Sequence, residues 1–125
     1  MAIKTVLVAD DDKNLIYLVT VALERSGYKV LSVGDGKQAV IQAGKKKPSL
    51  IILDINMPVM NGWDALAMLK SGPATKAIPV LMLTTEGLVA DVDRAMNSGA
   101  NGYIVKPFDM KHLLDKITAL AVGRY

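Results

Sequence analysis

Residues 50–54 read Leu-Ile-Ile-Leu-Asp, so one carboxylate ends an otherwise aliphatic run. Three more aspartates, Asp10, Asp11 and Asp12, follow the aliphatic residues 6–9. Carboxylates that meet beside apolar strands repel one another, which raises their pKa values and costs stability. A hard divalent cation removes that repulsion, because carboxylate oxygens, carbonyl oxygens and water are its preferred ligands. If the fold brings the two runs together, these acids predict a site for Mg²⁺ or Mn²⁺.

A hydroxyl and an ammonium group end two other apolar runs. Thr84, followed by Thr85, ends one of them, and Lys106 ends the other, directly before a proline. Both groups are suited to bind the oxygens of a phosphoryl group that lies between them and the metal. Asp54 would then act as a nucleophile that forms an acyl phosphate. The combined set predicts phosphoryl transfer to an aspartate.

Each residue also has a simpler explanation when it is considered alone. Asp12 or Asp11 would cap a helix that starts near Lys13. Thr84 would be an ordinary hydroxyl at a strand end, and Lys106 an ordinary solvated lysine. These explanations leave the cost of several neighbouring carboxylates uncompensated, so we favour the functional interpretation.

The elements that must position these residues alternate five times along the chain. We expect strands at residues 3–9, 28–33, 50–54, 78–84 and 102–106, and helices near 13–26, 35–46, 61–71, 86–98 and 109–121. The helical segments carry apolar residues at a period of 3.6. Gly27, Gly72 and Gly99 stand where helix C-caps belong, and Asp109 is placed to cap the last helix.

The composition of the strands predicts their order. Segments 50–54 and 78–84 are continuously apolar, as strands covered by helices on both faces must be. Segment 28–33 alternates and 102–106 is short, so both suit the edges of a sheet. We therefore expect a three-layer α/β fold with a five-stranded parallel sheet. Its functional crevice would lie at the carboxyl ends of the strands, beside the switch in strand order.

Length and composition predict one domain, residues 1–125, in a reducing compartment, with the cytoplasm as the default. Apolar residues make up 51% of the chain and there is no cysteine. No apolar stretch approaches the ~18 residues of a membrane helix. The N-terminus does not resemble a signal peptide, because its apolar run meets Asp10 with no cleavage site after it. The chain stops soon after the last expected helix, so it is interpreted either as a stand-alone protein or as the first domain of a longer one.

The net charge of +3 does not predict nucleic-acid binding by this domain. Lys45, Lys46 and Lys47 form the one run of lysines, and a solvated helix end explains it. A nucleic-acid surface would need a wider basic face with aromatic residues, and the chain has one Trp, four Tyr and one Phe. We expect neither nucleic acid nor membrane as a direct partner.

Four stretches of this sequence resemble the receiver domain of response regulators in two-component signalling. They are VLVADDDKN (6–14), LIILDINMPVMNGWDAL (50–66), IPVLMLTTEG (78–87) and SGANGYIVKPF (98–108). The resemblance covers nearly the whole chain, and all four stretches fall on expected strand ends. It implies the flavodoxin-like strand order 2-1-3-4-5, which a chemotaxis member of the family also has.

The resemblance also implies a role for each acid. Asp54 would accept the phosphoryl group from the phosphohistidine of a sensor histidine kinase or a histidine phosphotransfer domain. Asp11 and Asp54 would bind Mg²⁺ directly, together with the backbone carbonyl of Asn56, and Asp10 would act largely through water. Such a chain catalyses only its own phosphorylation and dephosphorylation, and is not otherwise an enzyme.

Further roles are implied for the basic, hydroxyl and aromatic residues. Lys106 would pair with Asp54 and then with the phosphoryl oxygens, and a cis bond to Pro107 would aim its ammonium inward. Thr84 would move to hydrogen-bond the phosphate, and Tyr103 would rotate inward behind it. This switch would change the face formed by the fourth helix, the fifth strand and the fifth helix. That face would act on a downstream protein or on an output domain that this chain does not contain.

Several neighbours are expected to tune the site. Thr85 stands where receivers often have alanine, and its branched side chain would slow dephosphorylation. Asn56 and Glu86, two residues after the acceptor and the threonine, would modulate the same rate. Trp63 is interpreted as a packing residue, and His112 as a surface or cap residue.

Other functional classes fit the sequence less well. Residues 34–39, GDGKQA, match a dinucleotide-binding pattern, but Asp35 would stand where the pyrophosphate belongs. A flavodoxin would need a neutral phosphate loop in place of residues 10–14. A phosphatase of the haloacid dehalogenase type would use Asp10 as nucleophile with Asp12, but would leave Asp54 unexplained. A receiver-like module that works without phosphorylation would usually lack one of the site residues.

Overall fold

A computed structural model describes residues 4–85 and 89–121. Its strands are β1 (Thr5–Ala9), β2 (Lys29–Val33), β3 (Leu50–Asp54), β4 (Val80–Thr84) and β5 (Gly102–Val105). Its helices are α1 (Lys13–Arg25), α2 (Gly36–Lys46), α3 (Gly62–Ser71), α4 (Val89–Asn97) and α5 (Met110–Ala121). The strands pair in parallel in the order β2-β1-β3-β4-β5, which confirms the predicted fold class.

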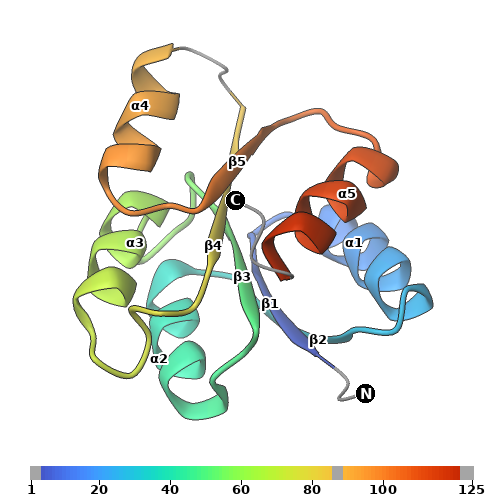
Figure 1. Ribbon diagram of the computed structural model, residues 1–125, viewed down its shortest axis with the longest axis horizontal. Coiled ribbons are helices and arrows are strands. Elements are labelled where there is room, and N and C mark those ends of the chain that lie inside the picture. Colours follow the sequence, from blue (N-terminus) through green and yellow to red (C-terminus); the bar gives the residue numbers. More distant parts are fainter. Residues whose placement is uncertain (1–3, 86–88, 122–125) are drawn as a thin grey trace.

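Helices cover both faces of the sheet (Figure 1). Helices α1 and α5 lie on one face, where their apolar side chains pack with those of β1, β3 and β4 around Leu23, Ile52 and Leu113. Helices α2, α3 and α4 lie on the other face, around Leu53 and Leu66. Every residue of β3 and β4 is buried, as their continuous apolar sequence predicts. The sheet thus forms a rigid support with all its carboxyl ends at one edge.

Helix ends follow the local sequence closely. The side chain of Asp12 accepts hydrogen bonds from the amides of Asn14 and Leu15, so the capping interpretation of Asp12 is confirmed. Asp109 caps α5 in the same way by accepting from the amide of His112, at 2.7 Å. Asp35 caps α2 by accepting a hydrogen bond from the amide of Gln38, so this residue of the dinucleotide-like motif has a helix-capping role.

The structure shifts several predicted boundaries by one or two residues. Strand β4 begins at Val80 rather than 78, because Pro79 has no amide hydrogen and the Ile78 amide bonds to Thr75 in a turn. Gly72 is the C-cap of α3, as predicted, and it has an extended backbone with a φ of −79°. Residue 3 of the first strand and residues 86–88 of the fourth helix lie outside the described residues.

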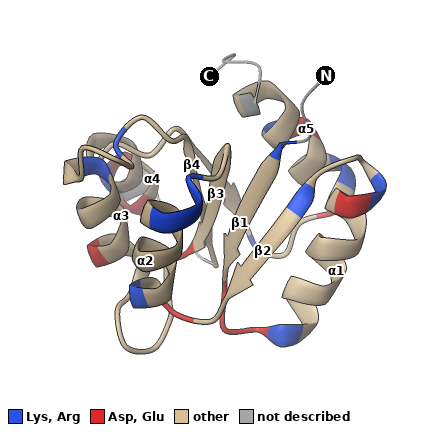
Figure 2. Ribbon diagram, turned by 90° about the horizontal axis from the view of Figure 1, so that it is seen from below, with Lys and Arg blue, Asp and Glu red and all other residues tan. Residues whose placement is uncertain are grey.

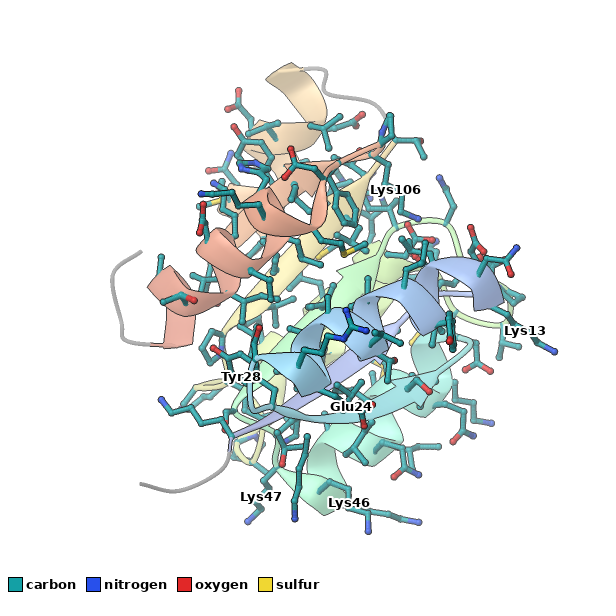
Figure 3. All side chains as sticks on the ribbon, turned by 90° about the vertical axis from the view of Figure 1, so that its right-hand side faces the viewer. Lys13, Glu24, Tyr28, Lys46, Lys47 and Lys106 are labelled. Atoms are coloured by element: carbon teal, nitrogen blue, oxygen red, sulfur yellow. The ribbon has the colours of Figure 1, made fainter. Side chains whose placement is uncertain are left out.

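The lysines at the end of α2 are exposed, and Figure 3 shows Lys46 and Lys47 pointing away from the ribbon. This confirms the solvated helix end predicted for them. Within residues 4–85 and 89–121, no helix is long and apolar enough to cross a membrane.

Candidate functional site

The carboxyl ends of β1 and β3 bring the predicted acids together. Ala9 and Leu53 are paired in the sheet, so Asp10 and Asp54, which follow them, end adjacent strands. Asp10 is 1% exposed and Asp54 4%, whereas Asp11 faces solvent. Carboxylate oxygens of the three residues lie within 4.8 Å of one another. Figure 2 shows acidic segments following the ends of β1 and β2, at the edge of the sheet where these acids meet.

Lys106 reaches this acidic cluster from the end of β5. Its Nζ lies 2.9 Å from Asp10 Oδ2 and 3.2 Å from Asp54 Oδ1. The Lys106–Pro107 peptide bond is cis, as the resemblance to receiver domains implies. The ion pair with Asp54 was predicted, but the closer contact with Asp10 was not. Figure 3 shows Lys106 at the same end of the molecule as Lys13, which begins α1.

The environment of the cluster shifts the pKa values of two of its members. Burial raises the pKa of the Asp54 carboxyl above its usual value, the charge of Asp10 raises it further, and the Lys106 ammonium opposes both. Burial by itself would lower the pKa of Lys106, but its hydrogen bond to Asp10 and the charges of both aspartates raise it overall. One ammonium therefore compensates the buried carboxylates only in part.

The donor chemistry of the cluster fits Mg²⁺. Each of Asp10, Asp11 and Asp54 offers one hard oxygen ligand, and their spacing allows them to share one cation. Mg²⁺ usually keeps several of its water ligands, and the exposed position of Asp11 leaves the cluster open to water. A cation here would supply the charge compensation that Lys106 supplies in part.

A pocket of about 190 Å³ opens beside the cluster. Its lining residues are Ile55, Asn56, Trp63, Thr84, Thr85 and Asp91. Thr84 is buried at the end of β4, while Thr85 is exposed at the rim. The pocket is thus lined by Thr84, Thr85 and Asn56, and the backbone carbonyl of Asn56 is the predicted metal ligand.

The remaining predicted residues lie around this centre. Tyr103 is half-buried and packs on the same side of the sheet as Met82, its partner in β4. Thr84 shares that side by strand alternation. The Lys116 Nζ lies 5.5 Å from the centre of the Tyr103 ring. Glu86 lies outside the described residues.

Trp63 and His112 have the structural roles expected of them. Trp63 packs against the apolar cluster between the sheet and α2, α3 and α4. His112 is exposed, and its amide takes part in the cap of α5.

Sequence reasoning missed two residues near the site, both on α4. Arg94 stacks over the Trp63 ring, with its Cζ 4.2 Å from the ring centre, and Asp91 lines the pocket. Their spacing of three residues puts both on one helix face, but no sequence signal shows that this face meets α3.

The residues of this site lie within the part of the chain that is similar to known proteins. A family model described as the response regulator receiver domain matches residues 6–118. The DNA-binding response regulator MtrA of Mycobacterium tuberculosis is 37% identical over 114 residues, which are 91% of this chain and 49% of that protein. The chain spans about half the length of the curated relatives it matches.

Two solved structures share the fold over nearly their whole length. CheY4, the chemotaxis response regulator of Vibrio cholerae, has a TM-score of 0.90 and 34% identity, covering 95% of this chain and 99% of that chain. The receiver domain of the sensor histidine kinase PA1611 from Pseudomonas aeruginosa has a TM-score of 0.87 and 28% identity, covering 98% and 99%. That receiver domain has a magnesium ion coordinated in its active-site cleft.

Proposed function

This chain belongs to the response regulator receiver domain family, and on that premise we propose that it accepts a phosphoryl group on Asp54 from a phosphohistidine. The observation that carries the proposal is the Lys106 ammonium, held by two buried carboxylates at the ends of adjacent strands. Such a cluster is costly to bury. A role in phosphoryl transfer therefore explains it better than a contribution to stability does. Residues 1–125 form one receiver domain in this proposal.

The proposed donor is a sensor histidine kinase or a histidine phosphotransfer domain. A carboxylate oxygen of Asp54 attacks the phosphorus, and the bond from phosphorus to the imidazole nitrogen breaks. The imidazole leaves with the electron pair of that bond and takes up a proton from water. In dephosphorylation, water attacks the phosphorus of the acyl phosphate and the bond from phosphorus to the Asp54 oxygen breaks. Phosphate is released and the Asp54 carboxylate is restored. The chain catalyses only these two reactions of its own side chain.

Receiver domains bind Mg²⁺ at an acidic pocket, and the acidic cluster of this chain fits that ion. Asp11 and Asp54 would hold it directly with the carbonyl of Asn56, and Asp10 would contribute through water. A bound ion would neutralise charge on the phosphoryl oxygens. Mn²⁺ has the same ligand preference and would replace it.

The other site residues orient and retain the phosphoryl group. Lys106 would move its hydrogen bonds from the carboxylates to the new phosphoryl oxygens. Thr84 would hydrogen-bond the phosphate from the pocket beside Asp54, and Tyr103, on the same side of the sheet, would turn inward behind it. Thr85, Asn56 and Glu86 would tune the lifetime of the acyl phosphate.

The output of the switch would be the face formed by α4, β5 and α5. Phosphorylation would bias an existing equilibrium between two arrangements of this face. The partner would be a downstream protein or an output domain outside this chain, since relatives such as MtrA are about twice as long. We propose no direct contact of this domain with nucleic acid or membrane. The proposal also includes a cytoplasmic location, because the donor kinase must first receive its own phosphoryl group from a nucleotide.

The alternative functions are less well supported. Both oxygens of Asp10 are engaged, Oδ1 by the Asp12 amide and Oδ2 by Lys106, which does not favour Asp10 as the nucleophile of a phosphatase. The family match over residues 6–118 also disfavours that enzyme class. A module that works without phosphorylation would not need to bury Asp54 beside Lys106.

The test is to incubate the protein with Mg²⁺ and a small acyl phosphate donor and to measure its intact mass. We expect one hydroxylamine-labile phosphoryl group on the native protein and none on Asp54→Ala. Asp93→Ala is the matched control, because Asp93 is exposed on α4 and lies outside the acidic cluster. A phosphoryl group that persists in Asp54→Ala would overturn the proposal.

A further inference from the structure

Gly36 closely approaches the loop that connects β3 to α3. It is the first residue of α2, and its amide nitrogen lies 3.0 Å from the carbonyl oxygen of Met60. A Cβ built on Gly36 would overlap that oxygen and lie 2.9 Å from the Met60 carbonyl carbon and 3.1 Å from the Asn61 oxygen. These are backbone atoms, so no side chain can turn away to make room. The close approach therefore requires glycine at this position.

The same loop is also closed at its base. The Gly62 amide donates a hydrogen bond to the Ile55 carbonyl, with a length of 2.7 Å. Between these two points of attachment, Met57 is buried in the core on the α2 and α3 side of the sheet. Asn56 stands between Ile55 and Met57, so its backbone belongs to a segment that is fixed at both ends.

The loop bends sharply just before its contact with Gly36. Val59 has a φ of 67°, in the left-handed region that β-branched residues avoid. Its side chain is 78% exposed, so it gains little packing in return. The amide of Met60 bonds to the Pro58 carbonyl, at 2.7 Å, across this bend. Such a conformation is strained and persists only where surrounding contacts hold it.

We infer that Gly36 is a positioning residue for the metal site, which acts through the Met60 carbonyl on the loop that carries Asn56. The contact between the two backbones holds the bend at Val59 in place, and the bend in turn sets where the Asn56 carbonyl points. This inference rests on the proposed function, because it takes that carbonyl as a ligand of Mg²⁺. It assigns Gly36, the second glycine of the dinucleotide-like motif, to positioning a metal ligand rather than to binding a nucleotide.

The first test is the Mg²⁺ affinity of Gly36→Ala, measured by titration calorimetry. We expect at least about tenfold weaker binding, in the range typical for partners that orient a ligand without touching the metal. Gly44→Ala is the matched control, because it lies on the same helix and has no atom within 4 Å of a built Cβ. It should bind Mg²⁺ like the native protein. Native affinity in folded Gly36→Ala would overturn the inference.

A second test uses the native protein, in case Gly36→Ala does not fold. If Mg²⁺ and the Gly36 contact stabilise each other, saturating Mg²⁺ must slow hydrogen exchange at the Gly36 amide. The comparison is the Lys47 amide, which bonds to Ala43 at the other end of α2. Slowing at Gly36 well beyond that at Lys47 supports the inference, and equal slowing contradicts it. A native protein that binds no Mg²⁺ at all would instead contradict the proposed function.

Discussion

Lys106 lies closer to Asp10 than to Asp54: its Nζ is 2.9 Å from Asp10 Oδ2 and 3.2 Å from Asp54 Oδ1. Asp10 thus holds the ammonium in place from the neighbouring strand. Because Asp54 is the proposed acceptor, this arrangement keeps the Lys106 ammonium beside Asp54 before phosphorylation. Without a bound metal, the stability of the protein therefore depends on the Lys106 ammonium, which pairs with both carboxylates.

Lys106→Met should lower the free energy of unfolding at about pH 7 in the absence of Mg²⁺, by about 3 kcal/mol, since it leaves two buried carboxylates without their cation. Urea denaturation with and without Mg²⁺ measures the effect, and Mg²⁺ should reduce the difference. Lys111→Met is the control, because its ion pair with Asp115 is exposed. An equal loss in both variants would contradict a special role for Lys106.

Asp54→Asn should stabilise the metal-free protein at about pH 7. Folding raises the pKa of Asp54 above its usual value of 3.8, mainly through burial. Between these two pKa values the folded state binds more protons than the unfolded state, so the stability of the native protein falls as the pH rises through that window. Urea denaturation over a pH series should show the gain of Asp54→Asn growing with pH and vanishing below 3.8. A gain that does not change with pH would contradict this origin.

Mg²⁺ should stabilise the native protein by about 2.7 kcal/mol at a concentration 100 times its Kd. Asp11→Asn should remove most of this effect and leave the metal-free stability nearly unchanged, since Asp11 is exposed. Thermal unfolding in a Mg²⁺ series checks both expectations. The control is Asp93→Asn, on the exposed surface of α4, which should be stabilised by Mg²⁺ as much as the native protein is. If Asp93→Asn also lost this stabilisation, Mg²⁺ would be acting by general screening of charge rather than by binding at the acidic cluster.

Thr85→Ala should lose its phosphoryl group several-fold faster than the native protein. Thr85 borders both the pocket at Thr84 and an apolar groove at Lys106 and Phe108, so its side chain narrows the approach of water. The decay of phosphorylated protein, followed by intact mass after the donor is removed, gives the rate. Thr118→Ala, at an exposed position on α5, is the control. Equal or slower loss in Thr85→Ala would argue against a shielding role.

Val59→Asn should raise the free energy of unfolding by about 1 kcal/mol, because asparagine tolerates the left-handed conformation better than a β-branched residue. Val59→Ala should gain less, since alanine retains a Cβ without the local hydrogen bonding of asparagine. Urea denaturation measures both. The Mg²⁺ affinity of Val59→Asn should remain native, because the Gly36 contact still holds the loop; weaker binding would show that the strain itself sets the site.

Local pattern was enough to predict the layers and the strand ends. Apolar runs of strand length, stripes of period 3.6 and capping aspartates depend on residues close in sequence, so each could be recognised separately. Asp54, Thr84 and Lys106 were found because each ends such a run. The boundaries moved where a local detail intervened, as at Pro79, whose missing amide delays the start of β4.

The sequence by itself thus determined which elements form and which residues stand at their ends, because these properties arise from short-range periodicity and backbone chemistry. Only the tertiary structure decided which of those residues touch. The contact of Lys106 with Asp10 joins positions 96 residues apart, and that of Gly36 with Met60 depends on how two separate loops pack. Such contacts follow from the register of the sheet and the packing of the loops that leave it, which no single segment encodes.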